Sequence, residues 1–290
     1  MAESARNGRP HPYGAQREPD LADSIDTARS GAIEKASHAV TNRRIRDLIE
    51  PWLTRPLRVL DIGCGSGFFL RGLAQTYRER GWAVADHLLG VDIDLSAYLA
   101  TDVPSRQVDI NRPLPFADGS YDLALAIEVF EHSRAPYILM QEVARVLAPG
   151  GRIVISVPNV MQALSRLSFL VTGHYYMYPT PSADPAKAGR LSGHIEPLPL
   201  QYWHYGLRYA GFTDIACTID RRKKGALAAA ALLKPLTMLG DAIYRRRIAN
   251  YDAALAAEVR DVLPAVNSFD VLTARSLIFS ARKSGGQPEK

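Results

Sequence analysis

Short apolar runs alternate with longer amphipathic stretches between residues 57 and 159. The runs are the length of buried strands, and the amphipathic stretches repeat their apolar positions about once per helical turn. Strands are therefore predicted at 57–63, 87–94, 106–110, 121–130 and 152–159, with helices at 68–80 and 135–148. This alternation predicts an α/β fold in which helices cover both faces of a doubly wound parallel sheet.

The pattern changes on either side of this core. An amphipathic helix is predicted at 30–49, and after Asn159 the chain reads as helix, aromatic loop, helix and strand. The later elements are predicted helices at 160–173 and 200–211, a strand at 212–220, a helical insertion at 221–263 and a last strand at 272–283. Residues 30–283 are then one domain, between a polar, disordered segment at 1–29 and a tail at 284–290.

Composition and charge bear on the size of the core, the cellular compartment and the kind of partner. The chain has 290 residues, 47% of them hydrophobic, so it can bury a large core. Its two cysteines, Cys64 and Cys217, form no disulfide framework, and the polar N-terminus has no secretory pattern. These features predict a cytoplasmic protein. The net charge of +5 is too mild to indicate nucleic acid by itself.

The stretch "VLDIGCGSGFF" (59–69) carries the strongest chemical signal. Neither register of its glycines completes a dinucleotide fingerprint, and no Lys-Ser/Thr pair follows as in a phosphate-binding P-loop. Asp61 would repel a pyrophosphate but attract an ammonium group, which S-adenosylmethionine carries. The glycines could instead form only a tight turn, Asp92 or Asp94 could cap a helix over 95–100, and Asp109 could be an ordinary loop acid.

Four blocks in order resemble the class I S-adenosylmethionine-dependent methyltransferases, in particular bacterial members of methyltransferase types 11 and 23. The blocks are "VLDIGCGSGFF", "GVDID", "VDINRPLPFADGSYDLALAIEVFEH" and "RVLAPGGRIVISVPN". The resemblance implies a Rossmann-like sheet of seven strands with the last one antiparallel, and residues 160–200 as a lid on the acceptor side. It also implies a cofactor-binding set of Asp61, Gly63, Cys64, Gly65 and Gly67 for the methionine part, Asp92 and Ile93 for the ribose, Asp109 and Ile110 for the adenine, and Glu128 lining the pocket.

Candidate catalytic residues follow the fourth predicted strand. Glu128, Glu131 and His132 lie in "EVFEH", and His194 lies in "SGHIEP". This set resembles the metal ligands of RNA 3′-end 2′-O-methyltransferases and of some quinone-biosynthesis O-methyltransferases, so a divalent metal is one interpretation. The other is that His194, with His132, acts as a general base. Both interpretations stay open at this point.

The insertion at 221–263 is distinctive because basic clusters border an apolar run. "RRKK" (221–224) precedes the run and "YRRRIANY" (244–251) follows it. Lys234, Pro235 and Asp241 interrupt the run, which predicts that it is too short and too polar to span a bilayer. Peripheral membrane contact through 221–250 is one hypothesis. The other is a helical hairpin packed on the sheet or on a second subunit.

The sequence therefore predicts a methyltransferase that modifies a hydroxyl of a small-molecule, lipid-linked or sugar-linked acceptor, in the cytoplasm or at the inner face of the membrane. Two alternatives remain: a metal-assisted RNA 2′-O-methyltransferase, and a non-catalytic, membrane-associated scaffold that binds S-adenosylmethionine. The basic clusters are short and no RNA-binding module is recognisable, which argues against nucleic acid.

Overall fold

The computed structural model describes residues 39–181 and 193–285. The chain divides into two compact units, Met1–Ala39 and Val40–Lys290, and the features below belong to the second. The predicted disordered segment 1–29, the start of the helix predicted at 30–49, part of the lid and the end of the tail lie outside the described residues.

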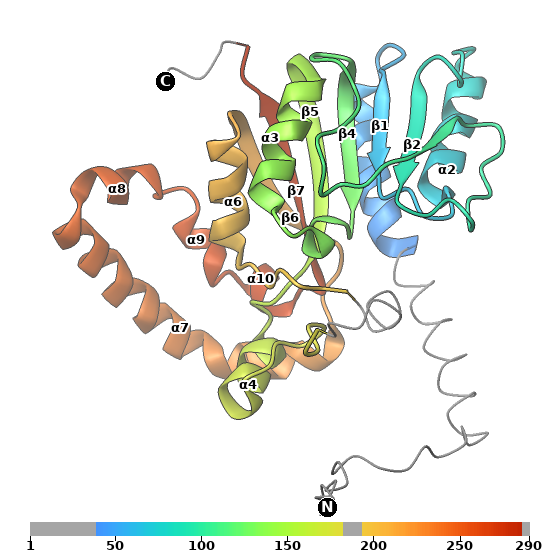
Figure 1. Cartoon of the computed structure of the whole chain (residues 1–290). Helices are drawn as coiled ribbons and strands as arrows, with labels where there is room; N and C mark the ends of the chain where they lie inside the picture. Colours follow the sequence, from blue (N-terminus) through green and yellow to red (C-terminus); the bar gives the residue numbers. More distant parts are fainter. Residues whose placement is uncertain (1–38, 182–192, 286–290) are drawn as a thin grey trace, which may run out of the picture. The chain divides into compact units, whose positions relative to one another are not determined.

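The described residues form one seven-stranded sheet in the order β3-β2-β1-β4-β5-β7-β6 (Figure 1). β7 runs antiparallel to both of its neighbours, and the remaining pairs are parallel. The fold class and the antiparallel last strand are therefore confirmed. The strands are β1 Val59–Ile62, β2 Leu88–Asp92, β3 Ser105–Gln107, β4 Tyr121–Ile127, β5 Leu147–Pro158, β6 Phe212–Ile219 and β7 Ser276–Lys283.

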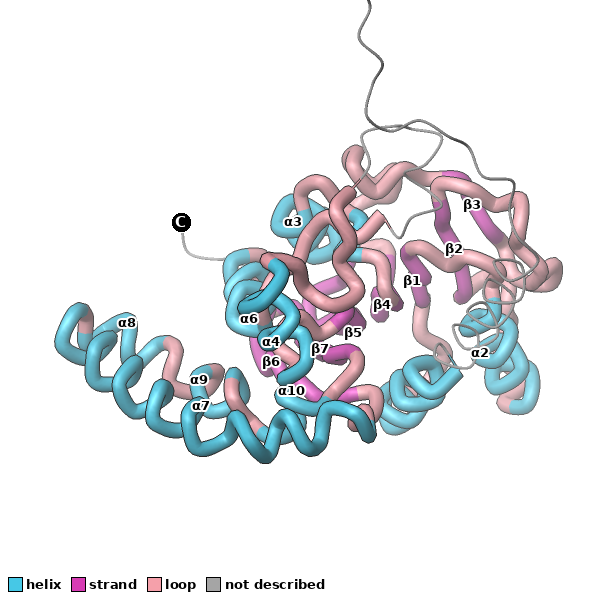
Figure 2. The backbone as a smooth tube through the Cα atoms, turned by 90° about the horizontal axis from the view of Figure 1, so that it is seen from below, coloured by secondary structure: helices cyan, strands magenta, loops and turns pink. Residues whose placement is uncertain are grey.

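Helices cover both faces of the sheet (Figure 2). On one face, Ile45 and Ile49 of the helix at 39–49 pack with Leu70 and Tyr77 of α2. On the other face, α3 and α6 contribute Met140, Trp203 and their neighbours to a second apolar cluster. The helices are α2 Phe68–Glu79, α3 Pro136–Val146, α4 Ala163–Thr172, α6 Leu200–Tyr209, α7 Lys224–Tyr251, α8 Ala253–Glu258, α9 Leu263–Val266 and α10 Phe269–Thr273, with the 3-10 turns η1 Glu50–Trp52 and η2 Phe130–His132.

β1 shows why these apolar runs become central strands. All four of its residues are buried, because β1 lies between β2 and β4 and helices cover both faces. A strand in that position needs apolar side chains on both faces, which is why the sequence shows a continuous apolar run there instead of an alternating one. Asp61, which is also buried in this strand, is the exception.

Some predicted boundaries were wrong. β4 ends at Ile127 and η2 follows, so the predicted strand end at residue 130 is a 3-10 turn. β5 starts at Leu147, because Leu147 pairs with Tyr121 before the Pro-Gly-Gly segment. The strand predicted from residue 272 begins at Ser276, after α10. No helix forms at 95–100 in the described chain. Asp94 Oδ1 instead accepts a 2.8 Å hydrogen bond from the Ser96 amide and closes a turn.

The insertion is dominated by α7, a single helix of 28 residues. By length and composition alone this helix is long and apolar enough to cross a membrane, so the prediction that the run is too short was wrong. α7 contacts α4, α8 and α10. The alternative of a hairpin packed on the sheet does not describe α7, because little of the helix is buried and its main contacts are with other helices.

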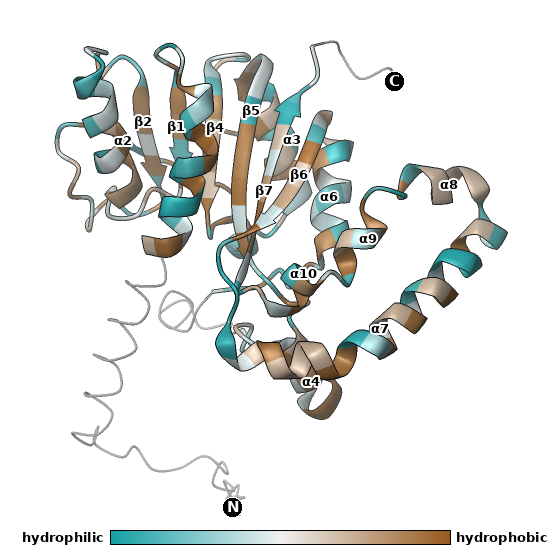
Figure 3. Ribbon diagram, turned by 180° about the vertical axis from the view of Figure 1, so that it is seen from behind, coloured by the Kyte–Doolittle hydropathy of each residue, from teal (hydrophilic) through white to brown (hydrophobic). Residues whose placement is uncertain are grey.

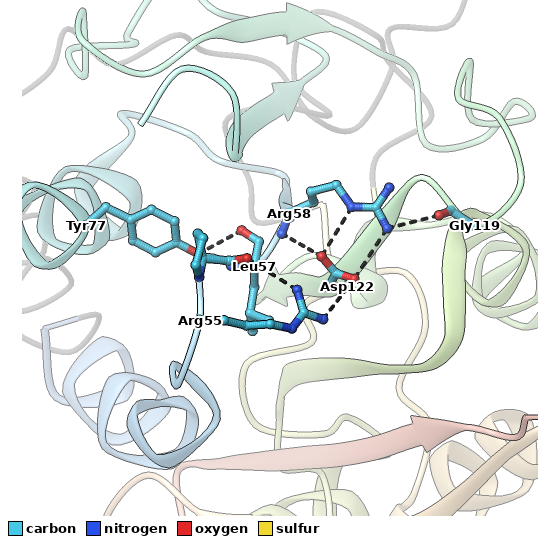
Figure 4. A network of polar contacts seen from close by, with 7 residues as sticks. Arg55, Leu57, Arg58, Tyr77, Gly119 and Asp122 are labelled. Atoms are coloured by element: carbon cyan, nitrogen blue, oxygen red, sulfur yellow. Dashed lines mark hydrogen bonds and ion pairs between the residues drawn. The ribbon is translucent and has the colours of Figure 1, made fainter. Parts of the chain in front are cut away.

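At the amino-terminal edge of the central strands, two arginines surround Asp122 (Figure 4). Asp122 Oδ2 accepts hydrogen bonds from the Arg58 amide at 2.9 Å and from Arg58 Nε at 3.2 Å, and Oδ1 accepts one from Arg55 Nη2 at 3.4 Å. Burial opposes ionisation, but these hydrogen bonds outweigh it and lower the pKa of Asp122 to about 2. These bonds hold the segment that leads into β1 against the start of β4.

Candidate active site

The glycine loop after β1 depends on backbone conformations that favour glycine. Gly63, Gly65 and Gly67 have φ angles of 69°, 50° and 75°, in the left-handed region where other residues are strained. Gly67 is the N-cap of α2, so the loop ends where the helix begins. The amides of Gly63, Cys64, Gly65 and Gly67 donate hydrogen bonds within the protein. The predicted carboxylate contact therefore falls to Ser66 and to the first amides of α2, where a helix start attracts anions.

The surroundings of the three glycines differ. A Cβ atom at Gly63 would lie 2.3 Å from Val129 Cγ2, and one at Gly67 would lie 2.7 Å from Tyr98 Cε2. Nothing lies within 4 Å of such an atom at Gly65. Gly63 and Gly67 therefore pack against protein, and Gly65 borders open space that a ligand can enter. The Gly63 contact also brings the loop against the segment that follows β4.

Asp61 is a buried acid at the base of this loop. It is 2% exposed, and burial together with the charge of Asp92 raises its pKa to about 8. A cation placed beside Asp61 would favour the ionised form. A phosphate beside Asp61 would oppose ionisation instead, and the contact of Asp61 with an ammonium group stays a prediction.

Cys64 packs into the fold. Its amide donates a hydrogen bond to the Val91 carbonyl at 3.0 Å. Its Sγ atom packs against Gly90, and a Cβ atom added at Gly90 would lie only 2.9 Å from that sulfur. Burial, followed by the charges of Asp61 and Asp92, raises the pKa of the thiol to about 12. The structure thus gives Cys64 a packing role, and its assignment to the cofactor-binding set rests on the resemblance alone.

Asp92 joins the end of β2 to the glycine loop. Its Oδ2 accepts a 2.8 Å hydrogen bond from the Gly65 amide, and its Oδ1 accepts one from the Asp94 amide at 3.2 Å. Each carboxylate oxygen keeps acceptor capacity for a further donor, such as a ribose hydroxyl. The neighbouring Ile93 is 60% exposed, which leaves an apolar side chain beside the predicted ribose position.

Asp109 closes a turn after β3. Its Oδ1 accepts hydrogen bonds from the Asn111 amide at 2.9 Å and from Asn111 Nδ2 at 3.1 Å. The hydrogen bond from the Asn111 backbone amide is the main cause of the lowered pKa of Asp109. This geometry matches the alternative of a loop acid that stabilises its own turn. Ile110 is half-buried against the core. The adenine contact of both residues stays a prediction.

Glu128 is held by other protein groups. Its φ is 57°, a strained value for a residue with a side chain, and its amide donates to the Ser156 carbonyl at 3.0 Å. Arg275 Nη1 lies 3.2 Å from Glu128 Oε2, and both side chains are nearly buried. The sequence offered no signal for Arg275, because the pairing of β7 with β5 brings it there from far along the chain.

Glu131, His132 and His194 meet beside this pair. One potential ligand atom from each lies within 4.8 Å of the others. The 3-10 turn η2 presents Glu131 and His132, and His194 approaches because the amides of Ile195 and Glu196 donate to the Glu131 carbonyl. These three residues could hold a divalent metal. Glu128, the fourth residue of the predicted set, is engaged by Arg275 instead.

The interior of this cluster has polar atoms without partners. Both carboxylate oxygens of Glu131 and the Tyr178 hydroxyl are buried, and none has a hydrogen-bond partner among the described residues. Burial, followed by the charge of Glu128, raises the pKa of Glu131 well above its usual value. Buried polar atoms are normally hydrogen-bonded, so orphaned ones mark a position where a ligand, ion or water completes the site.

The two imidazoles have different environments. His194 Nδ1 donates to the Met177 carbonyl at 2.8 Å, and its Nε2 lies 3.8 Å from Glu131 Oε1, too far for a hydrogen bond. His132 packs edge-on against His194 with 4.8 Å between ring centroids, and it is the more exposed of the two. Partial burial of the ring among its neighbours, followed by the nearby His194, lowers the pKa of His132, although part of the side chain reaches solvent. This direction favours the neutral ring, which can accept a proton.

Tyr178 and Met177 were not singled out from the sequence. They lie in the aromatic segment 174–179, whose sequence does not distinguish Tyr178 from its neighbours. In the structure Tyr178 lies 5.3 Å from His194 between ring centroids. Met177 has a φ of 71°, so the backbone is strained where its carbonyl holds His194.

Comparison with known proteins identifies the family of this chain. The family described as a methyltransferase domain matches residues 34–220, well over half of the chain. The chain belongs to this methyltransferase family. The predicted family and fold class are confirmed, and the S-adenosylmethionine cofactor agrees with them.

The relatives add detail. The chain is 31% identical over 176 residues to the O-methyltransferase rstn1 of Aspergillus nomiae, which covers 56% of this chain and 73% of that protein. It is 38% identical over 109 residues to an uncharacterized methyltransferase of Mycolicibacterium gilvum, covering 36% of this chain. It is 36% identical over 106 residues to a probable chloroplastic tocopherol O-methyltransferase of rice, covering 35% of this chain and 29% of that protein.

These matches cover only parts of most relatives. The chain spans about 40% of the length of the mycobacterial relative and 37% of its counterparts in other mycobacteria. Among solved structures, a methyltransferase from Archaeoglobus fulgidus aligns with a TM-score of 0.51 at 18% identity, covering 84% of this chain and 94% of that one. That likeness shows the fold.

Proposed function

We propose that this protein is an S-adenosylmethionine-dependent methyltransferase that acts on a hydroxyl of a small-molecule, lipid-linked or sugar-linked acceptor. One observation carries the proposal. Gly63 packs against Val129, which places the glycine loop with Asp61 against the segment that ends in Glu131 and His132. A donor held by the loop therefore lies next to groups that can receive a proton.

The donor side is built to hold a zwitterion. Asp61 would bind the ammonium of the methionine part, and the first amides of α2 would receive its carboxylate. Asp92 would accept from the ribose hydroxyls. When bound, the cofactor supplies an activated methyl group on a sulfonium. The residues of this chain align that group and keep water away from it, which can lower the barrier by about 7–11 kcal/mol.

The acceptor side supplies the base. Transfer forms a bond between the acceptor oxygen and the methyl carbon as the carbon–sulfur bond breaks, and the hydroxyl proton passes to His132. The lowered pKa of His132 favours the unprotonated ring, the form that can accept this proton. The ring of His194 packs edge-on against His132, and a hydrogen bond to the Met177 carbonyl fixes the orientation of His194. Two relatives are named O-methyltransferases, which supports oxygen as the acceptor atom.

The proposal places the protein in the cytoplasm. Its two cysteines are free among the described residues, and Cys64 is buried beside the glycine loop, which suits a reducing compartment.

Transfer of a labelled methyl group tests the function. Purified protein would be incubated with methyl-labelled S-adenosylmethionine and fractionated bacterial lipids, polysaccharides and RNA. We expect label in the lipid or saccharide fraction, stable to treatment that cleaves methyl esters. Label confined to RNA, or no transfer to any fraction by a protein that binds the cofactor, would contradict the proposal.

A further inference from the structure

Two helices outside the core expose an unusually apolar surface. At the end of α4, Leu170 and Val171 are 79% and 81% exposed, and α7 exposes a longer series of apolar side chains. Figure 3 shows many hydrophobic residues along both helices. α4 and α7 contact one another. The exposed apolar residues of α7 are Leu227, Leu232, Leu236, Met238, Leu239 and Ile243, with Tyr244 and Tyr251 after them.

The charges in the middle of α7 point away from this surface. Lys234 Nζ donates to the Asn267 carbonyl at 2.6 Å, and Asp241 Oδ1 accepts from Asn267 Nδ2 at 2.5 Å. Lys234 and Asp241 are seven positions apart and so lie on one face of the helix. Buried Ala230 and Ile248 lie on that same side. The sequence suggested that these charges interrupt the apolar run, but the structure turns both of them toward the protein.

The opposite face of α7 is therefore continuous. From Gly225 to Ile243 its outward positions carry Gly, Ala, Leu, Pro, Met and Ile, a stripe about 28 Å long at 1.5 Å per residue. Basic residues border the stripe at both ends: Lys223 and Lys224 at the start, and the exposed Arg245, Arg246 and Arg247 at the end. An apolar face with basic residues at its ends fits the interface of an anionic bilayer, where long basic side chains reach the headgroups.

The contacts of α7 decide between lying on a bilayer and crossing it. A crossing helix would have to leave α4 and α10 and take Lys234 and Asp241 away from Asn267 into hydrocarbon. A helix lying along the surface keeps all of these contacts and buries the outward stripe alone. The observed packing thus favours an interfacial helix.

The apolar surface also adjoins the acceptor side of the site. After α4 the chain turns at Gly173 and runs through Tyr176, Met177 and Tyr178. Lys223, just before α7, donates to the Tyr176 hydroxyl at 3.2 Å, and the next residue, Met177, holds His194 through its carbonyl. A molecule bound at the tip of α4 would therefore be one short loop away from His194.

We propose that the tip of α4 and the outward stripe of α7 form a docking surface for an anionic phospholipid bilayer, which presents a lipid-embedded hydroxyl acceptor to the His132–His194 pair. The docking surface is defined here as Phe169–Val171 together with the outward positions of 225–243. The second half of the proposal rests on the proposed function. The docking itself does not depend on it.

Flotation of the full chain with vesicles tests the docking. Vesicles of phosphatidylcholine mixed with the anionic lipid phosphatidylglycerol would be compared with vesicles of phosphatidylcholine alone, because anionic headgroups attract basic residues. We expect binding to the anionic vesicles that weakens as salt is added. Replacing Arg245, Arg246 and Arg247 with Ser should weaken binding roughly 100-fold, at about fivefold for each charge.

Two double variants test whether vesicle binding depends on the docking surface or on any exposed apolar residue. Leu232→Glu/Leu236→Glu alters residues that are 78% and 65% exposed, and the control Ile138→Glu/Tyr209→Glu alters residues that are 62% and 61% exposed on α3 and α6. We expect the first pair to reduce vesicle binding at least about tenfold, and the control to leave it unchanged. Melting curves would show that both remain folded. Equal loss in both pairs, absence of wild-type binding, or a dimer that the first pair alone abolishes would overturn the docking proposal.

A cofactor-binding variant keeps the two proposals distinguishable. Asp61→Asn should bind vesicles as the wild type does while losing methyl transfer, so a failed transferase would leave the docking result intact. For the acceptor, label should enter a vesicle-embedded hydroxyl lipid, and Leu232→Glu/Leu236→Glu should reduce that rate at least about tenfold in parallel with binding. Label that enters water-soluble acceptors equally well in both proteins would overturn the acceptor half.

Discussion

The two edges of the central sheet treat buried acids in opposite ways. At the amino-terminal edge Asp122 is surrounded by Arg55, Arg58 and a backbone amide, and its pKa falls to about 2. At the carboxyl edge Asp61 and Glu131 are buried beside other acids, and both pKa values rise. The hydrogen-bonded Asp122 stabilises the fold, whereas raised pKa values such as those of Asp61 and Glu131 are typical of functional sites.

This contrast also reverses the response to pH. Asp122 adds stability above its unfolded pKa of roughly 4, and that stability is lost as the pH falls toward 2. Asp61 has a folded pKa of about 8, so its contribution is present below pH 4 or so and is lost as the pH rises through 8. The two edges therefore set opposite limits on the pH range in which the fold is most stable.

The largest expected effect is on cofactor affinity. Gly65→Val places a branched side chain in the open space of the loop, and we expect the affinity for S-adenosylmethionine to fall at least about 100-fold by calorimetry. Gly81→Val is the matched control, because Gly81 also has a positive φ of 71° and open space around it but lies after α2. Equal affinity in the two variants would exclude the loop as the binding site.

The next largest effect is expected on the rate of methyl transfer when the proposed base, His132, is replaced. His132→Asn should reduce the rate of methyl transfer about 100- to 10,000-fold with cofactor affinity retained. In the wild type the rate should fall as the pH drops below the lowered pKa of His132, and the variant should lack that dependence. His87→Asn, at the opposite edge, serves as the control. Activity abolished by a chelator and restored by a divalent ion would favour the metal interpretation of Glu131, His132 and His194.

A smaller effect still is expected on stability at the amino-terminal edge. Asp122→Asn should lower the free energy of unfolding by about 1–3 kcal/mol at pH 7, because hydrogen bonds from charged donors are weakened. The difference from the wild type should shrink between about pH 4 and pH 2, where the wild-type carboxylate becomes protonated. Denaturant titration would measure both. Cofactor affinity should not change, and a change there would break the contrast between the edges.

The smallest effect concerns the pH slope of stability. Asp61→Asn removes the buried ionisable group, so the wild type should lose stability relative to the variant as the pH rises from about 4 to 8. Melting temperatures across that range would show the diverging curves. Parallel curves would mean that Asp61 is already ionised in the folded protein.

Much of the core could be predicted because local pattern and tertiary position agree there. The apolar run of β1, the glycine conformations and the amphipathic α2 are each encoded within a few residues. The partner of Glu128 could not be predicted, since Arg275 reaches it only through the pairing of β7 with β5. The orientation of α7 was missed for the same reason. Asn267, which turns Lys234 and Asp241 inward, lies beyond the helix in sequence.

The contact between Gly63 and Val129 limits how this enzyme can change its acceptor. A larger residue at either position would push the cofactor loop and the histidine segment apart, so variation there would harm every substrate alike. The chain between Gly173 and Tyr178 instead leads to the carbonyl that holds His194, so new side chains there can change the surroundings of the histidines without disturbing that junction. Libraries intended to redirect the enzyme should therefore diversify this segment and leave residues 63 and 129 fixed.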